Sequence, residues 1–134
     1  ILNGLKKKNN KTKKIDFLIY YREHPNKKVF FPYGLIRNLV KLNLKIFIVG
    51  DKLSIKGVKN LGKINNKKIQ NLLSQTRYSI ASGENIMSLF TIDCINNNVK
   101  ILLNSNQSIE IKKFNKYFIK LNFNSKKIEN KLKF

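Results

Sequence analysis

The stretch Ile15–Tyr21, IDFLIYY, decides the fold class of this chain. It is an apolar run broken only by Asp16, and it is rich in β-branched and aromatic side chains. Runs of this kind are typical of strands that are buried on both faces, as in a parallel sheet covered by helices. The stretch therefore predicts a buried strand of an α/β domain.

From this strand onward, segments with strand character alternate with segments that have the three- and four-residue spacing of helices. Further strands are predicted at Leu44–Val49, Val58–Leu61, Arg77–Ala81, Val99–Leu103 and Tyr117–Phe123. Helices are predicted at Val29–Leu42, from a cap at Asn65 or Asn66 through Leu73, at Ser88–Asn98, at Ser108–Phe114 and at Ser125–Leu132. Strict alternation predicts an α/β fold class, with a Rossmann-like parallel sheet flanked by helices on both faces.

The length of 134 residues and the apolar content of 42% suit one compact domain with its own core. Residues 1–14 are polar and dense in lysine, which is typical of a solvated segment. We therefore expect residues 1–14 to be a basic linker or interdomain segment, and residues 15–134 to be one α/β domain. Because the chain begins with Ile1, we expect either a missing start or a fragment of a longer protein.

The sequence also bears on the location of the protein. No apolar run reaches the roughly 18–20 residues of a membrane span, and no signal-peptide pattern opens the chain. Cys94 is the single cysteine, which excludes an internal disulfide, and its place on an apolar helix face predicts a core position. We expect a cytoplasmic protein, and the basic surface leaves peripheral binding to the inner face of the membrane open.

The net charge of +21 favours a polyanion as partner, but the type of basic residue argues against base reading. Of the 28 basic residues only Arg22, Arg37 and Arg77 are arginine, and the others are lysine. Lysine, asparagine and isoleucine have A/T-rich codons, so an AT-rich genome produces such a composition without functional pressure. Because planar phosphate and base recognition favour arginine, we expect no nucleic-acid partner. A non-catalytic basic α/β module that binds RNA or another polyanion remains the alternative.

In parallel α/β sheets, ligands bind in the crevice at the carboxyl ends of the strands. No glycine fingerprint follows the first strand, so a nicotinamide or flavin cofactor lacks its main support. His24 is the only histidine, which excludes a histidine-rich metal site. The loops expected at the carboxyl edge are Arg22–Lys28, Gly50–Leu53, Gly62–Asn65, Ser82–Ser88 and Asn104–Gln107.

Four motifs occur in a fixed order along these strands and loops. Tyr21-Arg22 ends the first strand and is followed by Lys27 and Lys28. The next motifs are IVGD at Ile48–Asp51, VKNLG at Val58–Gly62 and SGENIMSLFTIDCINNNVKILLN at Ser82–Asn104. In type and order they resemble the C-terminal, nucleotide-sugar-binding domain of group 1 type retaining glycosyltransferases with the GT-B fold. The resemblance covers roughly Ile15 to Asn104.

This resemblance implies one half of a GT-B fold and transfer of a hexosyl or related group. The donor would be a nucleotide-diphosphate sugar, and the acceptor would be a saccharide or a lipid-linked saccharide in surface polysaccharide biosynthesis. The donor is the only small molecule implied, without a further cofactor and without a metal. The acceptor would be bound by an N-terminal half, so this domain alone is expected to bind donor and to turn over poorly.

The resemblance also implies roles for single residues. Arg22 and Lys28 would neutralise the leaving diphosphate, and together with Glu84 they are the catalytic candidates. Asp93 falls on the second acid of the family motif, which binds the ribose hydroxyls. The donor-binding candidates are Lys27, Gly50, Asp51, Ser82, Gly83, Asn85, Ser88 and Asp93.

The last motif departs from the family pattern at several positions. Asp93 replaces a glutamate, and the family spacing counted back from it falls on Asn85 rather than on Glu84. Asn98 stands where a glycine ends the helix, and asparagine tolerates the left-handed conformation of that position. These departures leave two alternatives open: Asp93 as an exposed helix residue without a ligand, and a degenerate glycosyltransferase-like domain.

Overall fold

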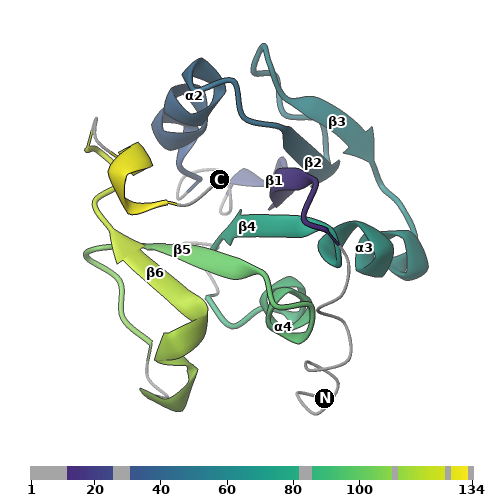
Figure 1. Cartoon of the computed structure of the whole chain (residues 1–134). Coiled ribbons are helices and arrows are strands. Elements are labelled where there is room, and N and C mark those ends of the chain that lie inside the picture. The colour runs from purple at the N-terminus through teal and green to yellow at the C-terminus, as the bar shows by residue number, and fades with distance from the viewer. Residues whose placement is uncertain (1–11, 26–30, 82–85, 110–111, 126–127, 133–134) are drawn as a thin grey trace.

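The computed structural model describes residues 12–25, 31–81, 86–109, 112–125 and 128–132, and within them six parallel strands form one sheet (Figure 1). The strands are β1 (Ile15–Tyr21), β2 (Ile46–Gly50), β3 (Lys59–Gly62), β4 (Thr76–Ile80), β5 (Lys100–Asn104) and β6 (Phe118–Leu121). The α-helices are α2 (Tyr33–Lys41), α3 (Asn66–Leu73) and α4 (Leu89–Asn96), and the 3-10 helices are η2 (Lys112–Tyr117) and η3 (Ile128–Lys131). The predicted Rossmann-like α/β class is therefore confirmed.

The spatial order of the strands is β3-β2-β1-β4-β5-β6, with every neighbouring pair parallel. Phe17 of β1 pairs with Ile46 of β2 on one side and with Tyr78 of β4 on the other. Successive strands of the chain are thus added outward from β1 to β3 on one side of the sheet, and outward from β4 to β6 on the other side, so the direction of addition reverses between β1 and β4. In open α/β sheets such a reversal separates the loops that follow the two strands and opens a crevice between them.

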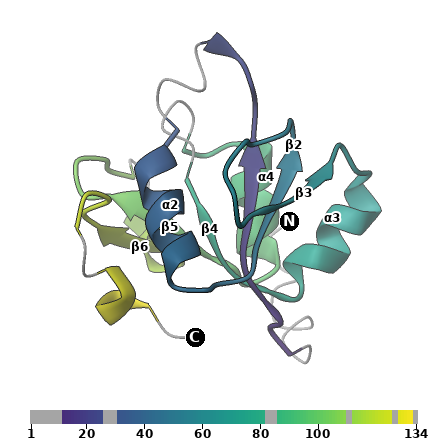
Figure 2. The same ribbon diagram turned by 90° about the horizontal axis from the view of Figure 1, so that it is seen from above.

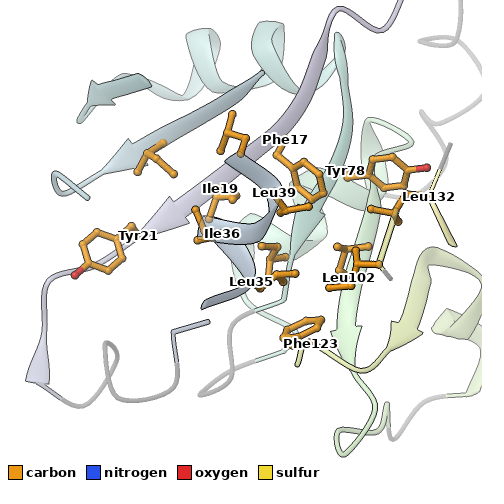
Figure 3. Packing of buried hydrophobic residues seen from close by; sticks show 14 of the residues in the cluster. Phe17, Ile19, Tyr21, Leu35, Ile36, Leu39, Tyr78, Leu102, Phe123 and Leu132 are labelled. Carbon is orange, nitrogen blue, oxygen red and sulfur yellow. The ribbon is translucent and has the colours of Figure 1, made fainter. Parts of the chain in front are cut away.

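Side chains of β1 alternate between two cores, one on each face of the sheet. Phe17 and Ile19 pack with Leu35, Ile36 and Leu39 of α2 in the α2-side core, which Figure 3 shows from close by. Leu18 points to the other face and belongs to the core under α3 and α4. Figure 1 shows α2 on one side of the sheet and α3 and α4 on the opposite side, and Figure 2 shows α2 from above, lying over the strands.

The ends of the helices follow the predicted capping chemistry. The Asn65 side chain accepts a hydrogen bond from the backbone N–H of Lys68 at the start of α3, which decides between the two predicted caps. Ser88 caps α4 by accepting from Thr91. Asn98 follows α4 with a φ of 58°, so the predicted left-handed asparagine is confirmed.

Three predicted helices differ in extent from the observed ones. The first, predicted from Val29, begins at Tyr33 after Pro32, which occupies the N-cap position, and Phe31 is not helical. The predicted helices after Ser108 and Ser125 are the short 3-10 helices η2 and η3. Both lie in segments rich in lysine and asparagine, and Ile128 and Leu132 are buried in the α2-side core, so packing rather than helix propensity determines the short extent of η3.

Lys13 precedes β1 and joins the ends of two helices. Its ammonium donates to the carbonyl oxygens of Ser74 (3.3 Å) and Asn97 (3.1 Å), which follow α3 and α4. Burial, followed by the positive charge of Arg77, lowers the pKa of Lys13. A cation at two helix C-termini is favourable because unpaired carbonyls concentrate negative charge there.

Cys94 lies in the core under α4 with 1% of its surface exposed, as predicted. Burial raises the pKa of its thiol well above the usual range, which suppresses the reactive thiolate. We expect the folded chain to react with a thiol-specific disulfide reagent orders of magnitude more slowly than the chain in urea. Since Cys94 is the only cysteine, the absorbance of the thiol that the reagent releases reports on this residue alone. Equal reaction rates in the folded and unfolded chains would contradict the buried position of Cys94.

None of the helices in the described part of the chain has both the length and the apolar character of a membrane span.

Candidate functional site

The carboxyl ends of β1, β2 and β3 are joined by the side chain of Asp51, directly after β2. One carboxylate oxygen accepts the backbone N–H of Glu23 (2.8 Å), and the other lies 3.7 Å from the ammonium of Lys63. The backbone N–H of Asp51 donates to the carbonyl of Tyr21 (2.9 Å). Asp51 therefore braces the loop after β1 against the ends of the next two strands.

Gly50 makes this close approach of the loops possible. Its φ is +99°, a value that side chains rarely adopt. A Cβ atom added at Gly50 would lie 2.5 Å from the carbonyl oxygen of Tyr21. The Val-Gly-Asp motif thus has a steric reason for its glycine and a hydrogen-bonding reason for its aspartate.

The electrostatics of this edge keep Asp51 ionised. The backbone N–H of Glu23, followed by the charges of Lys63 and Arg22, lowers the pKa of the Asp51 carboxyl group. Lys63 is 82% exposed, so the Lys63–Asp51 ion pair adds little stability and remains accessible to solvent ions. The hydrogen bond from the backbone N–H of Glu23 is therefore the contact through which Asp51 holds the loop after β1.

Arg22 extends from the end of β1 into solvent on the side of α4. A hydrogen bond with the hydroxyl of Tyr20 raises the pKa of the Arg22 guanidinium, and an arginine side chain remains charged at physiological pH in any case. The Tyr20 ring lies 5.6 Å from the ring of Phe90, which belongs to the first turn of α4. Tyr20 therefore connects the cation after β1 with the start of α4, across the point where the strand order reverses.

The start of α4 carries two of the predicted site residues. Ser88 caps the helix, and Asp93 lies in its second turn. Asp93 follows Leu89 by four residues and Phe90 by three, so all three lie on the same side of the helix. Leu89 is 83% exposed, and Asp93 is half-buried. The side of α4 that carries Asp93 is thus partly open to solvent at its amino end.

Of the predicted site residues, Arg22, Gly50 and Asp51 meet at the carboxyl edge of β1 and β2. Ser88 and Asp93 lie on α4, which contacts this edge through Phe90. The other predicted residues lie outside the described part of the chain: Lys27, Lys28, Ser82, Gly83, Glu84 and Asn85.

The sequence interpretation missed Tyr20, Glu23 and Lys63, which contact the predicted residues. Tyr20 had a detectable signal, because it is separated by one residue from Arg22 and side chains two apart on a strand share a face. Lys63 follows Gly62 at the end of β3, and its contact with Asp51 depends on the order of the strands. Local spacing contains no information on that order.

A cavity of about 370 Å³ lies beside the second half of α2 and contains none of the predicted site residues; it is lined by Asn38, Leu39, Lys41, Leu42, Asn124, Ser125 and Ile128. Among the described residues, no group of three histidine, cysteine, aspartate or glutamate side chains could hold a metal ion. The groups at the carboxyl edge are the Arg22 cation, the capped N-terminus of α4 and the carboxylates of Asp51 and Asp93, which can accept hydrogen bonds from hydroxyl groups.

Comparison of the chain with protein-family models and with curated proteins finds no match. The arrangement of residues at the carboxyl edge is consequently the basis on which the function is inferred below.

Proposed function

We propose that this domain binds a nucleotide-diphosphate sugar at the carboxyl edge of its sheet, as the donor-binding half of a retaining GT-B glycosyltransferase. One observation carries the proposal. The loop that bears Arg22 and the segment that starts α4 flank the reversal of strand order between β1 and β4, joined by the Tyr20–Phe90 contact. This is where α/β sheets of this order bind phosphorylated ligands.

The diphosphate is the part of the donor that this edge suits best. Two adjacent phosphates need cations and oriented N–H donors, and both are available here from Arg22 and from the amino end of α4. A dinucleotide-type cofactor instead needs a glycine-rich turn after β1. Tyr21 and Arg22 occupy those positions, so their side chains would prevent the close approach of backbone to pyrophosphate.

The remaining roles follow the family resemblance. Asp93 accepts hydrogen bonds from the ribose hydroxyls, and Gly83 and Asn85 contact the phosphates or the donor sugar. Lys28 shares with Arg22 the neutralisation of the departing diphosphate as the glycosidic bond breaks. In a GT-B enzyme the acceptor site lies in the other half of the fold, so this domain by itself is expected to bind donor and to turn over poorly.

The proposal is tested by calorimetric titration of the chain with UDP, GDP and their sugars at low salt. We expect micromolar to millimolar binding of one nucleotide class. Arg22→Ala should weaken this binding roughly tenfold or more, because a charge-assisted contact to the diphosphate is lost. Asp93→Ala should weaken it by a similar factor, and Asp93→Asn less, because the amide oxygen still accepts one hydroxyl.

Arg37→Ala is the matched control, since Arg37 is an exposed arginine on the outside of α2. It removes the same charge and should leave nucleotide affinity unchanged. Equal losses in Arg22→Ala and Arg37→Ala would mean that net charge alone attracts the nucleotide. A steep salt dependence without preference for nucleoside diphosphates would instead support the alternative, a basic module for RNA or another polyanion.

A further inference from the structure

The loop after β1 carries a carboxylate directly beside its cation, because Glu23 follows Arg22. Glu23 is exposed, yet its backbone and its side chain are both held by neighbouring groups. We propose that Glu23 binds hydroxyl groups of the donor sugar and thereby sets the preference of the site for a sugar nucleotide over a free nucleotide. This inference rests on the proposed function and assigns to Glu23 a role in that site.

Two contacts position Glu23 from opposite directions. The carboxylate of Asp51 accepts its backbone N–H at 2.8 Å, which fixes the course of the loop. The phenol of Tyr21 donates to the Glu23 carboxylate, which fixes the side chain. A side chain that is ordered before the ligand arrives loses less conformational entropy on binding, and such preorganisation is typical of residues that contact ligands.

The Tyr21 phenol is itself held in place by an aromatic cluster. Tyr21 is 2% exposed, and its hydroxyl lies 2.9 Å from that of Tyr33 at the start of α2. The Phe31 ring packs edge-on against both, with centroids 4.7 Å from Tyr21 and 5.0 Å from Tyr33. Figure 3 shows Tyr21 at the margin of the α2-side core, at the end of β1. A buried support under an exposed carboxylate is more than a solvated surface glutamate requires.

The cation and the carboxylate leave β1 toward opposite faces of the sheet. Arg22 forms a hydrogen bond with Tyr20, whose ring contacts α4. Glu23 instead accepts a hydrogen bond from Tyr21, whose hydroxyl contacts Tyr33 of α2. A ligand seated over the end of β1 would meet positive charge on the α4 side and a hydrogen-bond acceptor on the α2 side. A diphosphate on the first side and a neutral polyhydroxyl group on the second match this polarity.

The chemistry separates the two parts of the donor. An ionised carboxylate only accepts hydrogen bonds, and sugar hydroxyls can donate to it. Phosphate oxygens have no proton to donate at neutral pH and are repelled by the same charge. Because the ribose hydroxyls are assigned to Asp93 on the α4 side, Glu23 on the α2 side is expected to interact with the donor sugar and not with the nucleotide, so the two effects can be measured separately.

The experiment compares UDP with UDP-glucose, and GDP with GDP-mannose, in titrations of the wild-type chain and three variants. Glu23→Gln should weaken sugar-nucleotide binding about tenfold while leaving the affinity for the free nucleotide unchanged or slightly higher. Tyr21→Phe keeps Glu23 but removes its support, so a smaller loss, again confined to the sugar nucleotide, is expected. Tyr117→Phe removes a hydroxyl from η2, remote from β1, and should change neither affinity.

Three outcomes would overturn the inference. Equal losses for nucleotide and sugar nucleotide in Glu23→Gln would show that Glu23 only shapes the loop. No change for either ligand in Glu23→Gln would show that the carboxylate does not contact the donor, although the donor site itself stands. Absence of any nucleotide binding by the wild-type chain would remove the proposed function as well, and this result is distinct because free UDP and GDP then fail too.

Discussion

Gly50→Ala is expected to lower the free energy of unfolding by about 3 kcal/mol or more, one of the two largest effects of a single substitution in this chain. Two costs combine at this position. The φ of +99° is strained for any side chain, and the new Cβ atom would lie 2.5 Å from the backbone carbonyl of Tyr21. Because a backbone atom cannot rotate away as a side chain can, β1 and β2 would have to separate at their carboxyl ends.

Gly34→Ala is the matched control, and urea denaturation followed by circular dichroism is the measurement. Gly34 lies in the first turn of α2, where an added Cβ meets nothing within 4 Å. There the same substitution should be neutral or stabilising by up to about 1 kcal/mol, because it restricts the unfolded chain. Similar urea midpoints of unfolding for the two variants would contradict the close approach of Gly50 to Tyr21.

Gly50→Ala chains that still fold should also bind nucleotide more weakly, because a displacement of Tyr21 would move Arg22, which follows it.

Phe17→Ala is expected to cost about 3–5 kcal/mol, a large part of the 5–15 kcal/mol that stabilises an ordinary domain. Phe17 is fully buried in the middle of β1 and stacks on Tyr78 of β4 at 5.5 Å between ring centroids. Its removal leaves a cavity where α2 packs on the sheet (Figure 3). The surrounding strands are fixed by their pairing on both sides and can close that cavity only in part.

The control for this cavity is Phe114→Ala. Phe114 is a half-buried residue of η2, with the ammonium of Lys113 5.4 Å from its ring centroid. Removing it should cost about 1 kcal/mol, because only part of its apolar surface leaves water on folding. Chemical denaturation compares the two variants under the same conditions. A Phe17→Ala chain as stable as Phe114→Ala would show that the α2-side core is less tightly packed than described.

The fold was predictable where one local signal dominated. β1 has the bounds that its apolar run predicts, and Asn65, Ser88 and Asn98 cap or end their helices as their chemistry indicates. The lysine-rich segments near the C-terminus were harder, because their short 3-10 helices depend on packing that no periodicity reveals. Alternation predicted a parallel sheet but not the order of its strands, which sets the position of the crevice.

The candidate site was predictable to the extent that it follows strand ends. Arg22 and Asp51 were identified as residues after buried strands, and the structure brings them within electrostatic reach of each other. The network of Tyr21, Glu23 and Tyr33 was not predicted, since it joins a strand to a helix whose start is shifted to Tyr33. Contacts of this kind depend on the tertiary arrangement.

The pairing of β1 with β4 has a further consequence, for the nascent chain. Every other strand pair joins strands that are consecutive in the sequence, whereas β1 can pair with β4 only after Tyr78, the partner of Phe17, has been synthesised. At roughly 5–20 residues per second of translation, β1 keeps one unpaired apolar edge for seconds, in which two nascent chains could associate through it. Charged residues stand at both ends of the stretch, with Lys13 and Lys14 before it and Arg22 after it. Repulsion between these charges on neighbouring ribosomes would disfavour such association until β4 arrives.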